Sequence, residues 1–207
     1  TSNYCIYLCI WYDLRRSYNI QIMKNTYIFL RHGKTIKNPS KNSREWDITN
    51  DALEIIDEYI KDNFFFGVTC IISSEEDKAY TTGISIAKIN NLEIIRMSEF
   101  NEINRSDKFL TSEDFLIQKK KQLDNLSSEI DGGESGLNAL NRFKLGIVKL
   151  ESKYKNEIIL IITHGTVMSL YFSELLNQTG NAFNRWQKLK FCALGRVENN
   201  IVVKDIV

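Results

Sequence analysis

Short apolar runs alternate with segments of helical periodicity along most of this chain, and this alternation restricts the folds that it can adopt. Residues 26–30, 68–72 and 157–162 are apolar runs of strand length, and a helical pattern follows later in the chain after each of them. Strands that alternate with helices are typical of proteins in which helices cover both faces of a sheet. We therefore predict a three-layer α/β sandwich with a mostly parallel central sheet flanked by helices.

The remaining elements follow from residue spacing and turn signals. Residues 134–154 form the clearest helix, with apolar side chains at three- and four-residue intervals, and Ser74 with Asp77 forms a capping-box-like pair. Asn199-Asn200 separates two apolar segments and predicts a terminal β-hairpin. The full set comprises helices at residues 50–61, 74–89, 113–126, 134–154 and 166–176, and strands at residues 26–30, 68–72, 93–97, 157–162, 191–197 and 201–206.

The length of 207 residues favours one domain, and its first well-formed strand pattern follows Met23. Residues 1–22 are predicted to be an upstream extension or a fragment end outside the fold, with an amphipathic anchor or an extra packing helix as alternatives, and residues 23–207 the folded domain. The apolar stretch at residues 4–12 is too short to cross a membrane, so no membrane partner is expected. The sequence leaves the oligomeric state open.

Composition narrows the classes of partner and location. Lys and Arg number 27 and Asp and Glu number 26, which gives a net charge of +1 and no reason to expect nucleic acid as a partner. The four cysteines have no zinc-binding spacing, and Cys70 and Cys192 lie in apolar runs where a reduced thiol behaves as a small hydrophobe. This usage predicts a reducing, cytoplasmic location.

The sequence contains two histidines, and each follows an apolar strand. His32 comes after the strand predicted at residues 26–30, and His164 comes after the one at residues 157–162. Because the carboxyl ends of parallel strands meet at one edge of a sheet, we expect the two imidazoles to lie close together there. A glycine follows each histidine, and we expect both glycines to allow a tight turn that exposes backbone amides to an anion.

A zinc site is the alternative use of two histidines. Such a site requires a third ligand, and no carboxylate or thiol stands at a recognisable ligand spacing. Arg31, directly before His32, would repel a cation and attract an anion. We therefore predict anion chemistry, with no metal and no cofactor.

The two most specific motifs of the chain are RHGKT at residues 31–35 and THG at residues 163–165. Together, and in this order, they resemble the motifs of the histidine phosphatase superfamily, also called the phosphoglycerate mutase-like family. The resemblance implies the fold of that family. Weaker matches are Asn38 at the position of an asparagine in the first motif, residues 46–49 before the first helix, residues 73–79 after the second strand, and residues 133–135 at the start of the long helix, where Ser135 is a predicted cap.

The resemblance also implies roles for individual side chains. His32 would attack phosphorus and form a phosphohistidine, Arg31 would bind the phosphoryl oxygens, and His164 would stabilise their charge in the transition state. Glu102 matches the family's acid, which protonates the leaving oxygen and activates water, and Glu99 is the alternative for that role. The predicted phosphate site is completed by Thr35, Asn38 and Lys78.

Lys78 stands where the family has a second arginine, and this is the main departure from the family pattern. Lysine supplies a flexible point charge in place of a bidentate clamp. Arg105 is either a compensating guanidinium or an ordinary surface charge. Glu75, Glu76 and Asp77 are expected to point to solvent, where the N-terminus of a helix favours their negative charge.

The predicted function is hydrolysis of a small-molecule phosphomonoester through a phosphohistidine intermediate. A cofactor-dependent phosphoglycerate mutase is the first alternative, although family mutases carry longer insertions over the site than this compact chain. The second alternative is a phospho-ligand-binding protein with weakened catalysis, which the lysine at position 78 motivates. The polar stretches at residues 37–47 and 103–131 are expected to determine the substrate, and Trp46 and Trp186 are predicted either to line the pocket or to pack in the fold.

Overall fold

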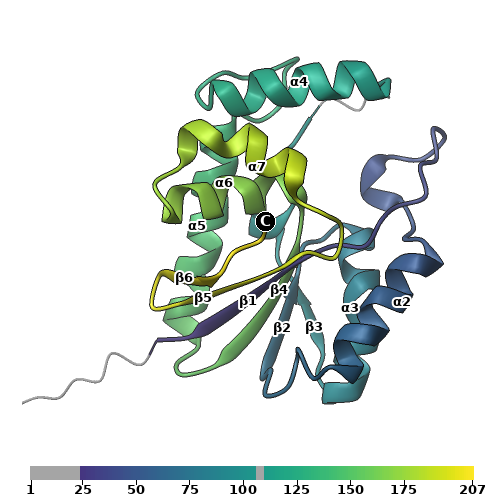
Figure 1. The fold of residues 1–207 in the computed structure, drawn as a ribbon, viewed down its shortest axis with the longest axis vertical. Coiled ribbons are helices and arrows are strands. Elements are labelled where there is room, and N and C mark those ends of the chain that lie inside the picture. The colour runs from purple at the N-terminus through teal and green to yellow at the C-terminus, as the bar shows by residue number, and fades with distance from the viewer. Residues whose placement is uncertain (1–23, 106–109) are drawn as a thin grey trace, which may run out of the picture.

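The computed structural model describes residues 24–105 and 110–207, and its centre is a six-stranded sheet (Figure 1). The strand order is β3-β2-β4-β1-β5-β6; the first four strands pair in parallel, whereas the β1–β5 and β5–β6 pairs are antiparallel. The predicted mostly parallel sheet is therefore confirmed. The strands span Thr26–Arg31 (β1), Cys70–Ser73 (β2), Ile94–Arg96 (β3), Ile158–Thr163 (β4), Leu194–Glu198 (β5) and Ile201–Lys204 (β6).

Helices cover both faces of the sheet, so the structure is the predicted three-layer sandwich. Helices α2 and α3 cover one face, and α5 and α6 cover the other (Figure 1). Helix α4 lies across the top of this view, with α7 below it. The helices span Asn50–Lys61 (α2), Asp77–Asn90 (α3), Ser112–Asp124 (α4), Gly136–Lys153 (α5), Gly165–Leu175 (α6) and Ala182–Lys188 (α7), with short 3-10 helices at Ser43–Glu45 (η1), Ser98–Phe100 (η2) and Thr179–Asn181 (η3).

Alternate residues of β1 enter the two halves of the core. Phe29 packs against Phe143 of α5 and Phe172 of α6, with ring centroids 6.0 and 5.4 Å apart. Leu30 joins the apolar cluster beneath α2 and α3. Both β1 side chains are fully buried, and burial of such a side chain stabilises the fold by about 1.5–3 kcal/mol. Because the inner strands are covered on both faces, they are continuous apolar runs in the sequence.

Each predicted strand and helix overlaps an observed one, and the helix at residues 50–61 has the predicted bounds. The terminal hairpin is also confirmed. Asn199 and Asn200 adopt positive φ angles of 54° and 63°, as a tight hairpin turn with two left-handed residues requires. The sequence patterns do not predict α7 or the three 3-10 helices.

The two predicted helix caps have different outcomes. Ser135 caps α5 as predicted, because its hydroxyl accepts a hydrogen bond from the N–H of Asn138 at 3.1 Å. The capping box at Ser74 and Asp77 is wrong. The chain extends beyond β2 before α3 begins, and this extension brings Oγ of Ser74 to 2.7 Å from Nε2 of His164.

Two further predictions concern the chain start and the thiols. The extension predicted at residues 1–22 lies outside the described residues. In the described ranges, no helix combines the length and the apolar composition needed to cross a membrane. Cys70 and Cys192 are free and buried, as the prediction of reduced thiols requires.

Candidate active site

The carboxyl ends of β1 and β4 bring the two histidines together. The strands are parallel neighbours with Arg31 opposite Thr163, so the next residue of each chain segment is a histidine at the same edge of the sheet. The imidazole centroids of His32 and His164 lie 5.0 Å apart, and both residues are buried. The expected proximity of the two imidazoles is confirmed.

His32 is oriented through one ring nitrogen. Its Nδ1 lies 2.7 Å from the carbonyl oxygen of Gly33, and because a carbonyl only accepts hydrogen bonds, Nδ1 carries the proton. Nε2 then keeps its lone pair, as a nucleophilic ring nitrogen requires. Burial, His164 and nearby cationic side chains lower the pKa of His32 well below its usual value, so the ring is neutral at pH 7.

His164 contacts two oxygen atoms from the segment after β2. Its Nε2 lies 2.7 Å from Oγ of Ser74 and 3.5 Å from Oε1 of Glu76, while Nδ1 has no hydrogen-bond partner among the described residues. Burial lowers the pKa of His164 to about 4, although the Glu76 carboxylate acts in the opposite direction. A phosphoryl dianion bound beside this ring would raise its pKa again.

Arg31 is held in place by a backbone contact and a ring contact. Its Nη1 donates to the carbonyl oxygen of Leu189 at 2.5 Å, and its guanidinium carbon lies 4.1 Å from the ring centroid of Phe191. Burial lowers the pKa of Arg31 to about 10, so the side chain is still a cation at neutral pH. A guanidinium fixed in this way is suited to bind phosphoryl oxygens through its planar set of donors.

The glycines beside the two histidines allow close packing. A Cβ on Gly33 would lie 2.7 Å from Cβ of Ala52, and a Cβ on Gly165 would lie 2.9 Å from the guanidinium carbon of Arg31. The N–H of Gly33 donates to Oγ1 of Thr82 at 2.9 Å. The expectation that Gly33 exposes its amide to an anion is therefore wrong, because α3 supplies a hydroxyl acceptor for that amide.

Lys78 and Glu76 form a buried ion pair at the start of α3. Nζ of Lys78 lies 2.6 Å from Oε2 of Glu76 and donates to the carbonyl oxygen of Ser43 at 2.7 Å. Glu76 is only 4% exposed, so the prediction that it points to solvent is wrong, whereas Glu75 and Asp77 are exposed as predicted. The physical reason is the buried ammonium, which is costly without an anionic partner.

Glu102 follows η2 and contacts the start of α6. Its Oε2 accepts the N–H of Thr166 at 3.1 Å, and its Oε1 accepts the N–H of Ile103 at 2.8 Å. Its own N–H donates to Oε1 of Glu76 at 2.8 Å. Burial alone would raise the pKa of Glu102, but Lys119 and the two amides help to hold it at about 2. Glu102 is therefore an ionised carboxylate in this structure.

Glu99, the alternative acid, lies away from the histidines. Its carboxylate forms an ion pair with Lys149 of α5, and it does not line the cavity that contains the histidines. Glu102 does line that cavity. Of the two candidates, the structure brings Glu102 to the site.

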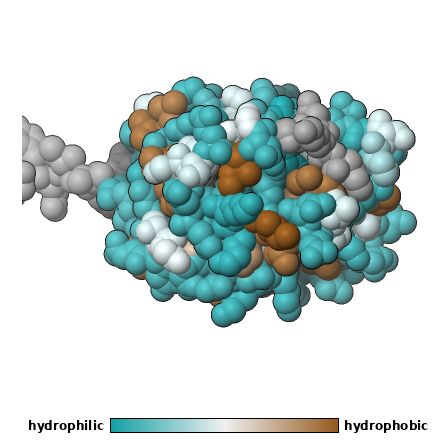
Figure 2. Space-filling view, turned by 90° about the horizontal axis from the view of Figure 1, so that it is seen from above, coloured by the Kyte–Doolittle hydropathy of each residue, from teal (hydrophilic) through white to brown (hydrophobic). Residues whose placement is uncertain are grey.

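The histidines belong to a cavity of about 220 Å³. We name its inner end the floor and its outer end the roof. Figure 2 looks onto the roof side of the molecule, where hydrophilic residues surround a few hydrophobic ones. The floor consists of Arg31, His32, Glu76, Lys78, Glu102 and His164, and the roof consists of the lining residues within 37–46, 104–105 and 110–119, together with Trp186.

The other two predicted phosphate ligands, Thr35 and Asn38, differ in their position relative to the cavity. Thr35 lines the cavity and forms an isolated β-bridge with Ile48. Asn38 does not line it: Oδ1 of Asn38 accepts the N–H of Ser40 at 2.9 Å, and its carbonyl oxygen accepts the indole N–H of Trp46 at 3.0 Å. The structure therefore brings Thr35, and not Asn38, to the site.

Residues that the sequence left open line the roof. Trp46 and Trp186 both line the cavity, and the Trp186 ring lies 5.9 Å from the ring of Phe115 between centroids. The guanidinium carbon of Arg105 lies 5.1 Å from the centroid of Phe115. Sequence patterns do not identify four lining or contacting residues, namely Ser74, Glu76, Lys119 and Phe191. Phe191 begins a predicted strand at residues 191–197, but the position of that strand beside β1 is known only from the structure.

The floor is suited to an anion. Arg31 and Lys78 bring two cations and several N–H donors beside the neutral imidazoles of His32 and His164, and Glu76 and Glu102 lie on the same floor. Across residues 24–105 and 110–207, no group of three or more His, Cys, Asp and Glu side chains is arranged to hold a metal ion. The absence of a metal and a cofactor from the reaction stays a prediction.

Comparison with known proteins defines the family. The sequence model of the histidine phosphatase superfamily (branch 1) matches residues 27–200. The chain therefore belongs to the histidine phosphatase superfamily, branch 1, as its two histidine motifs predict. This membership supports its assignment to the enzymes as a phosphoric monoester hydrolase. No curated protein matches the sequence significantly.

Solved structures share the fold at low sequence identity. A mycobacterial glucosyl-3-phosphoglycerate phosphatase in complex with VO3 gives a TM-score of 0.69 at 15% identity, over 87% of this chain and 97% of that one. A mutant phosphoserine phosphatase from Entamoeba histolytica in complex with phosphoserine gives 0.70 at 18% identity, over 87% and 94%. Bacillus stearothermophilus YhfR gives 0.71 at 15% identity, over 88% and 96%. These likenesses confirm the predicted phosphoglycerate mutase-like fold.

Proposed function

We propose that this protein hydrolyses a small phosphorylated metabolite through a phosphohistidine formed on His32. The observation that carries the proposal is the geometry of the two imidazoles, which lie 5.0 Å apart with Arg31 and Lys78 on the same cavity floor. The free thiols of Cys70 and Cys192 agree with a reducing compartment. A cytoplasmic location is part of the proposal.

The first step is attack on phosphorus by His32. Its Nδ1 proton is held by the carbonyl oxygen of Gly33 at 2.7 Å, which leaves Nε2 with a lone pair. Because the pKa of the ring is well below its usual value, no proton has to be removed before attack. The N–P bond forms as the bond from phosphorus to the leaving oxygen breaks.

The cations of the floor stabilise the charge on the transferring group. Arg31 would donate to two phosphoryl oxygens, and His164 would donate to a third as the geometry at phosphorus changes. Lys78 adds a positive charge at the start of α3, where Glu76 fixes its ammonium at 2.6 Å. Donors that are already in place need no reorganisation when charge develops.

Glu102 would give its proton to the leaving oxygen and then receive one from the water that attacks phosphohistidine. In this structure its pKa is about 2, so it must gain a proton when substrate binds. A phosphoryl dianion on the floor raises the pKa of a nearby carboxyl, which favours that gain. The second transfer breaks the N–P bond, releases inorganic phosphate and returns Glu102 to its protonated form.

A phospho-ligand-binding protein with weakened catalysis is the second candidate. The observation in its favour is the ion pair between Lys78 and Glu76, which reduces the charge available to phosphate. The mutase remains an alternative prediction. A monophosphoglycerate distinguishes it, because a mutase interconverts the isomers, whereas a phosphatase releases inorganic phosphate.

The test is incubation with a generic phosphomonoester, with wild type beside His32→Ala. We expect phosphate release and an acid-labile phosphoprotein in wild type and neither in the variant. Absence of both turnover and phosphohistidine in the wild-type protein overturns the proposal and favours the binding protein. A large gain in activity in Lys78→Arg would show that lysine limits catalysis.

A further inference from the structure

We propose that the roof binds a second anionic group, so that the substrate is a phosphomonoester whose leaving group carries a carboxylate or another phosphate. This inference rests on the proposed function, because it concerns the other end of the same substrate. The cavity is rich in positive charge. Among the described residues that line it, seven are lysine or arginine and two are glutamate. The whole chain has a net charge of only +1.

The floor accounts for two of these cations and both carboxylates. Arg31 and Lys78 lie there with Glu76 and Glu102, so the floor is balanced before a phosphoryl group adds its charge. The other cations of the cavity lie on the roof.

Three roof cations come from separate segments, and two of them lie against the same aromatic ring. Nζ of Lys119 and the guanidinium carbon of Arg105 lie 5.6 and 5.1 Å from the centroid of the same ring, Phe115. Arg44 donates to Oδ1 of Asn104, the residue before Arg105, at 3.0 Å. Lys119 is 2% exposed, and burial together with Arg105 lowers its pKa to about 8. Lys119 is buried, Arg105 is half-buried and Arg44 is exposed. Cations gathered at one end of a cavity favour an anion between them.

The carboxylates around this group are already engaged. Glu102 is the carboxylate that acts most strongly on Lys119, and its two oxygens also accept backbone amides. Both oxygens of Glu134 bind Arg142 of α5, at 2.9 and 2.8 Å. The hydrogen bond of Lys119 goes to the neutral Gln122 at 3.0 Å. Glu102 therefore supplies one negative charge beside three roof cations, and a carboxylate or phosphate on the substrate would supply further counter-charge.

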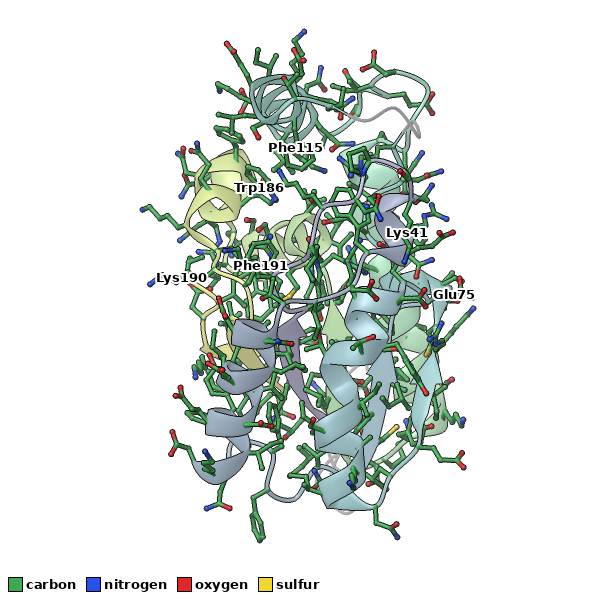
Figure 3. The ribbon with its side chains drawn as sticks, turned by 90° about the vertical axis from the view of Figure 1, so that its right-hand side faces the viewer. Lys41, Glu75, Phe115, Trp186, Lys190 and Phe191 are labelled. Carbon is green, nitrogen blue, oxygen red and sulfur yellow. The ribbon has the colours of Figure 1, made fainter. Side chains whose placement is uncertain are left out.

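The aromatic residues of the roof give the body of the substrate a surface. Phe115 of α4 and Trp186 of α7 lie on the same side of the molecule, as Figure 3 shows, with ring centroids 5.9 Å apart. Both line the same cavity as the roof cations and the floor histidines. The carbon skeleton that joins the two anionic groups would therefore pass along these rings.

Matched substrates that differ in one anionic group test the proposal. The pairs are glycerol 3-phosphate with 3-phosphoglycerate, phosphoethanolamine with phosphoserine, and fructose 6-phosphate with fructose 1,6-bisphosphate. In at least one of these pairs, we expect kcat/KM to be at least about tenfold higher for the second member, which carries the additional carboxylate or phosphate. The difference should come mainly from a lower KM, and it should become smaller at high salt. Equal values within all three pairs would overturn the proposal.

Variants of the roof locate the second anion. Arg105→Ala and Arg44→Ala should each reduce the preference within the favoured pair several-fold. Arg196→Ala is the control, because this arginine of β5 pairs with Glu198 at 2.7 Å and does not line the cavity. A preference that both roof variants retain in full would also overturn the proposal.

Binding measurements separate this inference from the proposed function. Calorimetry on His32→Ala measures affinity without phosphoryl transfer, with the same substrate pairs. If wild type hydrolyses nothing, the proposed function fails, yet tighter binding of the doubly anionic member would still support the roof site. Hydrolysis of all substrates with equal binding within each pair would leave the proposed function standing and remove the second-anion site.

Discussion

The floor of the cavity is built on the ends of buried strands, whereas the roof is built on loops and on helices α4 and α7. His32 and His164 are 6% and 0% exposed and follow neighbouring strands, so the sheet fixes their separation. On the roof, Lys41 pairs with Asp47 at 3.6 Å, and both side chains are largely exposed. The rigid part of the molecule therefore carries the groups proposed for chemistry, and the adaptable part carries the groups proposed for selection.

The floor and the roof also differ in the partners of their charged side chains. On the floor, the ammonium of Lys78 has an anionic partner at 2.6 Å. On the roof, Lys119 bonds to a neutral amide, and Arg105 lies against an aromatic ring. Paired charges favour a defined geometry, while the surplus on the roof favours an incoming anion. Substitutions on the floor should therefore change kcat, and substitutions on the roof should mainly change KM.

The largest effect is expected for His32→Ala. Loss of the proposed nucleophile should lower kcat by at least about 10⁴-fold, because the phosphohistidine on His32 can no longer form. The measurement is phosphate release with a generic phosphomonoester, together with a melting temperature to show that the variant folds. Residual turnover within tenfold of wild type would contradict the role of the floor.

Glu102→Gln is expected to have the next largest effect. An amide cannot donate the acid's proton, so kcat with an alkyl phosphate should fall by about 10²–10⁴-fold. The loss should be far smaller with 4-nitrophenyl phosphate, whose leaving group needs no proton. Glu99→Gln is the matched control, since Glu99 pairs with Lys149 outside the cavity. Equal losses with both substrates would show that Glu102 does not act as the acid.

The floor could largely be predicted from the sequence because strand ends in a parallel sheet fall at one edge. His32, His164 and Arg31 follow from that rule and from the motif around them. Glu76 could not be predicted in the same way, because an acidic residue at a helix start is usually favoured in solvent. Its burial depends on the neighbouring ammonium of Lys78, which is a tertiary contact.

The roof is where prediction from sequence failed most. Helix α4 follows from its pattern, but nothing in that pattern indicates that Lys119 turns inward to 2% exposure. Helix α7 is short, and its Phe183 and Trp186 spacing gives a weak signal on its own. Side chains from such segments meet only because the chain folds back over the cavity, so their contacts depend on the whole structure.

Low pH should destabilise the protein because His164 is buried on the floor in its neutral form. The pKa of His164 is about 4 in the folded state and near 6.5 when unfolded, so the unfolded chain takes up a proton first as the pH falls. The contribution of His164 to the free energy of unfolding should be retained above pH 6.5. At pH 4 protonation of this residue in the unfolded chain should lower that free energy by about 3 kcal/mol. Urea unfolding at several pH values measures this slope. His164→Asn should flatten the slope without abolishing it, because His32 acts in the same direction; an unchanged slope contradicts the assignment.

Glu76→Gln should separate positioning from charge on the floor. The amide keeps the shape of the side chain but no longer neutralises Lys78 or fully holds the N–H of Glu102. We expect inhibition by inorganic phosphate to become several-fold stronger while kcat falls about tenfold, which corresponds to about 1.4 kcal/mol. Glu75→Gln is the control, because Glu75 is exposed. If kcat and phosphate inhibition fall together, Glu76 has only a structural role.

The smallest effects are expected at two helix caps, one in the roof and one in the framework. Thr111 accepts the N–H of Asp114 at 3.1 Å at the start of α4, and Ser135 accepts the N–H of Asn138 at the same distance at the start of α5. Loss of either cap to alanine costs about 1 kcal/mol.

Ser135→Ala should lower the global free energy of unfolding by that amount, because α5 covers the sheet. Thr111→Ala should instead speed amide exchange in α4 and raise KM with little global effect, because the roof can open while the sheet stays folded. Equal global losses in urea unfolding would show that the roof and the framework unfold as one unit.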